Sequence, residues 1–333
     1  MTSDWLILHG GALGDLVLTI QLALRLPGVA EHGLHLISRV NPGDLALCRP
    51  RITRQWSEGL GLHWLFSDSD DPPPSPLAEQ VRGRRVLSAL GGPHTIVHQR
   101  LLELRPAALY GLDPRPAPGV ERHITEQWRS QLEQQGLLIP KCIHQRPAQR
   151  SLGVSETVRA RGRALLAAWG AAHVRAARPA DPGTRTPVFV IHPGSGGRRK
   201  CWPSDRFIAV ARELREQRSA EVVFLLGPVE LETWSADEVA LITGEFAAIR
   251  SPTADELVAA LCAADVFVGN DAGPTHLAAL LGTRTVAVFG ATSATIWRPL
   301  GQAVTVVVGE PSSGAEGPWP LSLAVASALG DIL

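Results

Sequence analysis

The sequence predicts an α/β protein built from two doubly wound parallel sheets, one in each of two facing domains. The chain has 333 residues with a hydrophobic content of 45%, enough for two ordinary domains with separate cores. Short apolar runs alternate with helical patterns along most of the chain, and this alternation implies strands in parallel order. The runs are continuous rather than alternating, which is typical of sheets covered on both faces.

In the first half we expect four strands, with helices beginning near Leu16, Pro42 and Pro76. The predicted strands are WLILH (5–9), LHLIS (34–38), HWLF (63–66) and TIVH (95–98).

The second half shows the alternation more clearly. Its predicted strands are VFVIH (188–192), EVVFLL (221–226), DVFVG (265–269), TVAVF (285–289) and VTVVV (304–308). The stretch 176–187 is rich in Pro, Gly and polar residues without periodicity, which predicts a linker. We therefore expect domains at 1–175 and 188–333. The last segment, WPLSLAVASALGDIL, predicts a closing helix, and the sequence leaves open whether it packs back on the first domain.

Composition excludes several classes of protein. The formal net charge is +0, which gives no indication of a nucleic-acid partner. The four cysteines, Cys48, Cys142, Cys201 and Cys262, include no C-x-x-C pair, which argues against a disulfide framework and a zinc site. No apolar stretch approaches the roughly 18 residues of a membrane span, and the N-terminus lacks a secretory pattern. These features predict a cytoplasmic protein.

Charge is distributed unevenly along the chain. Residues 1–175 carry 20 Lys+Arg and 15 Asp+Glu, whereas residues 176–333 carry 12 and 17. The first half is thus the better candidate to meet an anionic acceptor. Peripheral contact with the inner membrane surface is consistent with that asymmetry.

The first predicted strand runs into the glycine loop GGALGD. A dinucleotide fingerprint needs G-x-G-x-x-G between strand and helix, but this loop supplies only Gly11-x-x-Gly14. It adds Asp15 in the first helical turn, where the helix dipole favours the ionised form. A negative charge there would repel a pyrophosphate, so the loop argues against dinucleotide binding.

A second glycine loop, PGSGGRRK, follows the strand 188–192. Its glycines, among them Gly196, free the backbone to turn N–H groups toward a ligand. Only two lysines occur in the chain, Lys141 and Lys200. Since arginine is otherwise the cation used, Lys200 is interpreted as a compact charge on a phosphate; the alternative is a solvated basic turn.

A third motif, NDAGPTH, follows the strand 265–269. Pro274 suits a first helical position, and the N–H groups of that helix start would meet a phosphate. Asp271 could accept hydrogen bonds from sugar hydroxyls, and His276 reaches the same place. The alternative is that Asp271 only caps the helix and His276 is a satisfied buried histidine.

Glu230 follows Gly227-Pro228 at another predicted helix start. A carboxylate there suits either the helix dipole or a ribose diol, and the sequence does not separate the two. Within residues 188–333, no D-x-D pair or histidine cluster has metal-ligand spacing, so we expect no metal ion and no cofactor.

Four motifs together resemble the bacterial heptosyltransferase family, glycosyltransferase family 9. They are GALGD (11–15), HPGSGGRRKCWP (192–203), LLGPVE (225–230) and NDAGPTHLAALLG (270–282). They occur in the family's order and spacing across nearly the whole chain. The resemblance implies the GT-B architecture, two facing Rossmann-like domains with a cleft between them.

The resemblance also implies residue roles. Asp15 would be the general base on the acceptor hydroxyl, in a loop with Gly11 and Gly14. Lys200, with Ser195 and Gly196 beside it, would contact the donor's phosphates and sugar, and Glu230 the ribose. The remaining donor-side positions are Asp271 for the sugar, Ala272 and Gly273 for phosphate through main chain, and His276 for the leaving diphosphate.

The resemblance thus implies an inverting, metal-independent transfer from a nucleotide-diphosphate sugar, with ADP-heptose as one candidate donor. The acceptor would be a lipopolysaccharide-like or other cell-surface glycan. Two alternatives stay open: a family member that binds nucleotide or glycan without turnover, and a nicotinamide-dependent enzyme on the same paired fold. The second is disfavoured because no complete G-x-G-x-x-G follows any strand.

Three places depart from the family's pattern. Ala272 stands where Ser or Thr is usual, so a hydroxyl is lost while the backbone N–H remains. His9-Gly10-Gly11-Ala12 replaces the usual Arg-x-Ser-x. His98, Gln99 and Arg100 replace an expected acidic strand end, so the sequence does not identify the acceptor.

Overall fold

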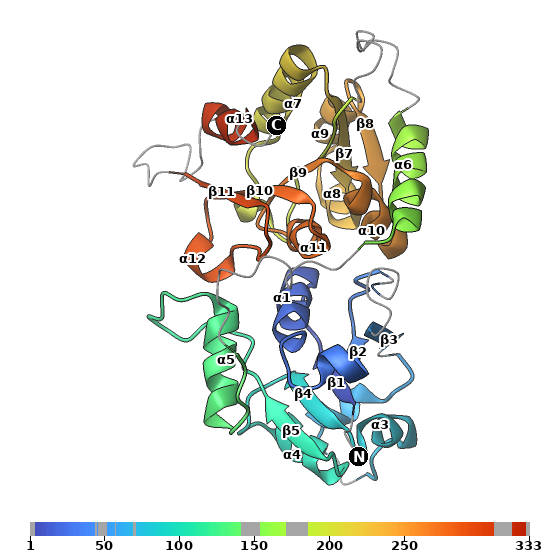
Figure 1. Cartoon of the computed structure of the whole chain (residues 1–333), viewed down its shortest axis with the longest axis vertical. Helices are drawn as coiled ribbons and strands as arrows, with labels where there is room; N and C mark the ends of the chain where they lie inside the picture. The colour runs from blue at the N-terminus through green and yellow to red at the C-terminus, as the bar shows by residue number, and fades with distance from the viewer. Residues whose placement is uncertain are drawn as a thin grey trace. The chain divides into compact units, whose positions relative to one another are not determined.

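The chain folds into two compact units, Met1–Arg146 and Pro147–Leu333 (Figure 1). The structure is a computed structural model. It describes residues 4–43, 45, 52–56, 58–68, 71–140, 154–170, 186–309 and 322–330.

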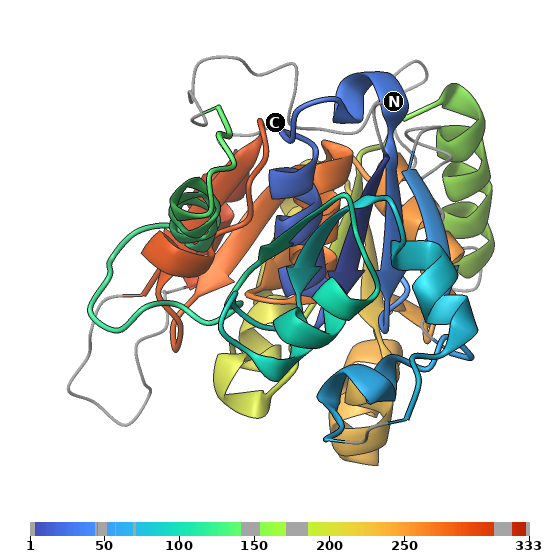
Figure 2. The same ribbon diagram turned by 90° about the horizontal axis from the view of Figure 1, so that it is seen from below.

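The first unit contains a five-stranded parallel sheet of order β3-β2-β1-β4-β5. Figure 2 shows these strands side by side. They are β1 (Trp5–His9), β2 (Leu34–Ser38), β3 (Ile52–Trp56), β4 (Arg85–Ala89) and β5 (Ala108–Gly111). The described helices are α1 (Leu13–Ala23), α2 (Val29–His32), η2 (Leu62–Phe66), α3 (Ser75–Val81), α4 (Ile96–Glu103) and α5 (Ile124–Gln134). The strand order reverses between β1 and β4, which makes that point the switch point of the sheet.

The second unit contains a six-stranded parallel sheet of order β11-β10-β9-β6-β7-β8. Its strands are β6 (Val188–His192), β7 (Glu221–Leu226), β8 (Ala247–Arg250), β9 (Val266–Asn270), β10 (Arg284–Phe289) and β11 (Val304–Val308). The described helices are α6 (Glu156–Gly170), η5 (Arg198–Lys200), α7 (Ser204–Arg218), α8 (Pro228–Thr233), α9 (Ala236–Thr243), α10 (Ala254–Ala263), α11 (Gly273–Leu281), α12 (Ala294–Trp297) and α13 (Ser322–Gly330). Here the order reverses between β6 and β9.

The central strands are buried on both faces, as their continuous apolar sequences predict. All five residues of β1 and all five of β9 are buried. Helix α7 adds Phe207, Ile208 and Leu214 to the core of the second unit. The predicted class, parallel doubly wound sheets, is confirmed in each unit.

Two predicted strands are wrong. Residues 63–66 belong to the 3-10 helix η2, which follows Gly61 in the left-handed region (φ 74°). Residues 95–98 open α4, because Thr95 caps that helix with a side chain that accepts from the His98 N–H. A four-residue apolar run does not distinguish a strand from a helical turn, and the capping threonine decides for the helix.

Four strands were not expected from the sequence: β3, β4, β5 and β8. The two shortest, ALYG in β5 and AAIR in β8, contain little β-branched character, and β3 (ITRQW) and β4 (RVLSA) are interrupted by polar or charged residues. Helix α3 confirms the helix expected near Pro76, and α1 begins at Leu13, slightly before the expected position. Most of the segment after Pro42 lies outside the described residues.

Helix α6 packs against α10 in the second unit. A Cβ on Gly162 would lie 1.9 Å from the Ala259 carbonyl oxygen, so the two helices meet almost backbone to backbone. The sequence had assigned this helix to the domain 1–175, but it is part of the second unit. The predicted linker 176–187 lies largely outside the described residues and stays a prediction.

The closing helix is present as α13, beside α7 (Figure 1). Val325 and Leu329 of α13 belong to the core of the second unit. Among the helices of the described segments, none combines the length and the apolarity that crossing a bilayer requires.

Candidate functional site

Polar residues gather at the switch point of the second sheet. Strands β6 and β9 are neighbours, with His192 paired to Gly269. Because they are parallel, the loop 193–202 after β6 and the turn 271–273 after β9 leave the sheet at the same edge. In open α/β sheets, ligands bind outside this edge at the point where the strand order reverses.

Asn270, the last residue of β9, fastens the glycine loop to the sheet. Its side chain is fully buried. The Nδ2 group donates to the carbonyl oxygens of Pro193 (2.8 Å) and Gly194 (3.2 Å), and Oδ1 accepts from the Trp202 N–H (2.9 Å). Both ends of the loop are therefore fixed by one amide. The sequence analysis assigned Asn270 no role, although a polar side chain ending a buried strand must find partners and could have been singled out.

The glycine loop is open toward solvent. Ser195 is buried, and its hydroxyl donates to the Asp271 carbonyl oxygen (2.8 Å). A Cβ on Gly196 or Gly197 would meet nothing within 4 Å. The protein itself thus does not require glycine at these two positions, and a ligand can approach the backbone closely there.

Asp271 is the centre of a charged cluster. Its Oδ2 lies 3.3 Å from Lys200 Nζ and accepts from the Thr292 hydroxyl (2.9 Å), and its Oδ1 lies 3.4 Å from His276 Nε2. Burial raises the pKa of this carboxyl, but the hydrogen bond and charge of His276, the charge of Lys200 and the Thr292 hydrogen bond together hold it below its usual value. The carboxylate is therefore ionised at neutral pH. Thr292 was not found by sequence reasoning.

His276 lies in the first turn of α11 and is 3% exposed. Its Nδ1 is buried and has no hydrogen-bond partner within the described part of the chain, so the histidine is not fully satisfied. The cap residue of α11 is Ala272, without a side-chain cap hydrogen bond. Asp271 is thus not a helix cap. By rule, the first N–H groups of a helix lack intrahelical partners and favour an anion.

Glu230 lies under the glycine loop. It is 2% exposed, and its Oε2 accepts from the Gly227 N–H (2.8 Å) at the start of α8. A Cβ on Gly194 would fall 1.9 Å from Glu230 Oε1. Gly194 is therefore needed to let the carboxylate lie against the loop.

The first glycine loop lies at the switch point of the first sheet, after β1. Asp15 is half-buried in the first turn of α1, and Gly14 precedes it in that helix. A Cβ on Gly11 would lie 3.0 Å from His9 Cε1 and 3.3 Å from Asp15 Oδ2, so imidazole and carboxylate flank the same point. His9 Nδ1 accepts from the Gly11 N–H (3.2 Å), and burial lowers the pKa of His9 to about 4. His9 is therefore neutral at pH 7, unlike the arginine usual at this position.

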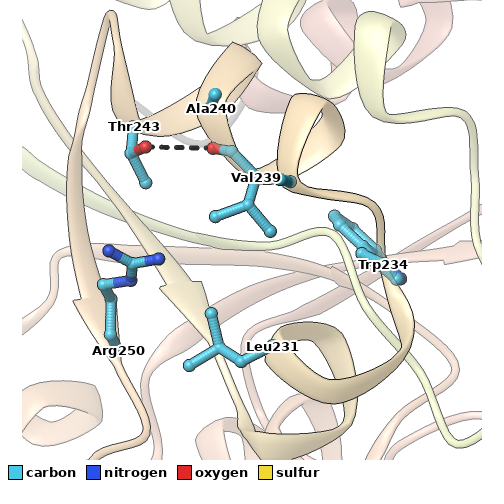
Figure 3. A pocket seen from close by; sticks show the side chains of 7 residues that line it. Leu231, Trp234, Val239, Ala240, Thr243 and Arg250 are labelled. Carbon is cyan, nitrogen blue, oxygen red and sulfur yellow. Dashed lines mark hydrogen bonds between the residues drawn. The ribbon is translucent and has the colours of Figure 1, made fainter.

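A groove of about 520 Å³ lies beside α8, α9 and β8 (Figure 3). Its lining residues are Leu231, Trp234, Ala236, Val239, Ala240, Thr243 and Arg250. The guanidinium of Arg198 stacks over the Trp234 ring at 5.0 Å. None of the predicted donor residues lines this groove, and its mainly apolar lining carries one cation, so it is not assigned to the diphosphate.

In the described segments, no three His, Cys, Asp or Glu side chains are grouped so that they could hold a metal ion. The ion pair at the site is the one between Lys200 and Asp271, and Glu230 lies against the same loop.

The strand orders define a doubly wound α/β protein, with candidate ligand sites at the carboxyl edges of its sheets. The chain belongs to glycosyltransferase family 9 (heptosyltransferase), whose family model matches residues 121–316. The match covers the three donor-side motifs and begins after Asp15, which it does not include. The family expected from the sequence is confirmed.

Known proteins agree with this assignment. Lipopolysaccharide heptosyltransferase 3 of Escherichia coli K12 is 36% identical over 123 residues, which is 35% of this chain and 35% of that protein. The match thus spans about a third of the curated relative's length.

Solved structures show the same fold at low identity. A glycosyltransferase family 9 protein from Veillonella parvula has a TM-score of 0.67 and 17% identity, covering 100% of this chain and 98% of that one. The E. coli heptosyltransferase WaaC with ADP has a TM-score of 0.63 and 15% identity, covering 99% and 100%.

Proposed function

We propose that this chain is an inverting glycosyltransferase that moves a sugar from a nucleotide-diphosphate sugar to a glycan or glycolipid of the lipopolysaccharide type. The observation that carries the proposal is the meeting of Lys200, Asp271 and His276 at the switch point of the second sheet. Membership of glycosyltransferase family 9 supports the reaction class.

The donor diphosphate would lie over the glycine loop and the start of α11. Lys200 supplies a positive charge on a side chain that is 45% exposed, and so is able to turn toward a ligand. The N–H groups of Ala272 and Gly273 supply the positive end of a helix dipole. Ser195 and Gly196 form the wall that the phosphates would approach.

Two carboxylates would hold the donor's hydroxyl groups. Asp271, ionised and close to the phosphate-binding residues, would accept hydrogen bonds from the hydroxyl groups of the transferred sugar. Glu230, which lies against the same loop, would accept hydrogen bonds from the ribose hydroxyl groups. ADP-heptose is the candidate donor, because a solved protein of the same fold carries ADP and relatives are named heptosyltransferases.

The reaction would be a single displacement. Asp15 takes the proton as the acceptor oxygen forms a bond to the anomeric carbon, and the bond from that carbon to the phosphate oxygen breaks. The nucleoside diphosphate leaves with the electron pair, stabilised by Lys200, His276 and the α11 N–H groups. Configuration is inverted, and neither a metal ion nor a cofactor takes part in this scheme.

The setting we propose is the cytoplasm. The acceptor is then a growing surface glycan on a lipid, and the excess of basic residues in 1–175 supports peripheral contact with the anionic inner membrane surface. No nucleic-acid partner is proposed.

Thermal stabilisation by ADP, UDP, GDP and NAD, without added metal, tests the donor site. One nucleoside diphosphate should stabilise the wild type, and Lys200→Ala should lose the effect. Arg218→Ala removes a positive charge from the last turn of α7 and is the matched control. Stabilisation by NAD alone, or by none of the four, would contradict the proposal.

Turnover of the nucleotide sugar tests the base. Asp15→Asn should lower kcat by roughly 100-fold or more, while nucleoside-diphosphate binding is kept, because the donor residues lie on other loops. Asp205→Asn, which also removes a first-turn carboxylate, is the control. Equal activity of Asp15→Asn and wild type would favour the alternative of a binding protein without catalytic turnover.

A further inference from the structure

Thr292 contacts the donor-site carboxylate from a third loop. It follows β10 and precedes α12, at the same edge of the sheet as the loops after β6 and β9. Its hydroxyl donates to Asp271 Oδ2 at 2.9 Å, which is shorter than the 3.3 Å between the same oxygen and Lys200 Nζ. Asp271 Oδ2 is therefore shared between a neutral and a charged donor.

The two charged partners of Asp271 have a second task. Under the proposed function, Lys200 and His276 both serve the diphosphate. Lys200 cannot give its full interaction to Asp271 and to the phosphates at once. Thr292 is assigned no contact with the diphosphate, and Ala272, the residue after Asp271, carries no hydroxyl that could replace it.

We propose that Thr292 is a positioning residue that keeps Asp271 oriented toward the donor sugar when Lys200 turns from Asp271 to the donor phosphates. The inference rests on the proposed function. It assigns the loop after β10 to the donor site, in addition to the loops of the three motifs.

The first test is the affinity of full-length variants for ADP-heptose, which carries the sugar that Asp271 would contact, measured by calorimetry without metal or acceptor. Thr292→Val keeps the shape of the side chain and removes the hydroxyl. A hydrogen bond to a charged group contributes enough that its loss should weaken binding roughly tenfold. Thr292→Ser keeps the hydroxyl and should bind within about twofold of wild type by the same reasoning. Ser293→Ala, on the adjacent residue, should match wild type because that serine makes no side-chain cap bond to α12.

The second readout is the pH profile of the same binding. The groups facing the Asp271 carboxylate are His276 from α11 and Lys200 from η5, together with Thr292. Because the Thr292 hydrogen bond helps to lower the pKa of Asp271, its removal raises that pKa. The pH below which binding affinity falls should then be higher in Thr292→Val than in wild type, and unchanged in Thr292→Ser. A loss of packing alone would not move it.

The outcomes separate the two proposals. If the wild type binds and Thr292→Val binds equally well, the role of Thr292 is overturned and the proposed function stays in place. The same conclusion follows if Thr292→Val and Thr292→Ser lose affinity equally. Failure of the wild type to bind ADP-heptose overturns the role of Thr292, and failure to bind ADP-heptose, ADP, UDP and GDP alike overturns both.

Discussion

At the scale of single residues, the candidate donor site depends on side chains that bond to backbone as much as on those that face a ligand. Asn270 is buried at the end of β9 and makes three hydrogen bonds to the loop that carries Lys200. The glycines of this loop have no side chains to fix its shape, so the amide of Asn270 supplies the constraint together with the Ser195 hydroxyl. Asn270 thus helps to hold Lys200 in place through the loop, and Asp271, the next residue, contacts Lys200 directly.

Asn270→Asp should weaken nucleoside-diphosphate binding roughly tenfold and lower the midpoint of unfolding by several degrees. The aspartate still accepts from Trp202, but its second oxygen faces the carbonyls of Pro193 and Gly194, and unmet buried polar groups cost about 1–3 kcal/mol each. Asn41→Asp is the matched control, because Asn41 Oδ1 only accepts from the Gly43 N–H and an aspartate does the same. Calorimetric binding and thermal unfolding measure both effects. If Asn270→Asp binds and unfolds like the wild type, the amide does not constrain the loop.

At the scale of elements, the close contact of α6 with α10 explains why a helix that precedes every strand of the second sheet belongs to its unit. Gly162 lets the helix backbones approach, and Arg159 donates to the Cys262 carbonyl oxygen at 3.1 Å. Glycine in the middle of a helix is unfavourable by about 1 kcal/mol relative to alanine. Its presence here is accounted for by the contact it permits.

Gly162→Ala should therefore destabilise the protein although alanine is the better helix former. The new Cβ would meet the Ala259 carbonyl and the Ala263 side chain, so α6 has to move away from α10. We expect a loss of about 1–3 kcal/mol, as for other overpacked contacts. Ala164→Val, on the exposed side of the same helix, should have little effect. Thermal unfolding of the two variants gives the comparison, and a stabilised Gly162→Ala would show that the contact is not tight.

Elements also show what the sequence could and could not predict. The buried strands β1, β6, β7 and β9 and the loops after them were predicted, because long β-rich runs end in glycine and polar residues. The strands β3, β4, β5 and β8 were missed, because they lack a continuous β-rich apolar run and are stabilised by pairing with neighbours that are distant in sequence. Within the site, too, residues in a local sequence motif were predicted and a residue brought in by strand pairing was missed. Lys200, Asp271 and His276 were expected in one place, whereas Thr292 needed the parallel order of β9 and β10.

At the scale of the whole molecule, the two units place different chemistry at equivalent positions. Each sheet has its polar loops at the switch point: in the first, His9, Gly11 and Asp15, and in the second, Lys200, Asp271 and His276. The second cluster combines the ammonium group of Lys200 with the N-terminus of α11. An anionic donor is therefore expected to stabilise the second unit, and the two units should respond differently to ligand and to pH.

Acidification should destabilise the first unit through His9. Burial lowers the pKa of this histidine from 6.5 to about 4 in the folded protein. Between those values the unfolded chain binds the proton and the folded chain does not, so stability present above pH 6.5 is lost as the pH falls toward 4. The loss should be about 3 kcal/mol, from roughly 1.4 kcal/mol for each unit of pKa.

His9→Asn tests this loss, because an asparagine can still accept from the Gly11 N–H and does not titrate. Thermal unfolding recorded at several pH values should show less acid destabilisation in His9→Asn than in wild type, while His63→Asn, at an exposed histidine of η2, behaves like wild type. A bound nucleoside diphosphate should stabilise His9→Asn and wild type equally, since its predicted contacts all lie in the second unit. Identical acid destabilisation of His9→Asn and wild type would mean that His9 is not the group that couples stability to pH.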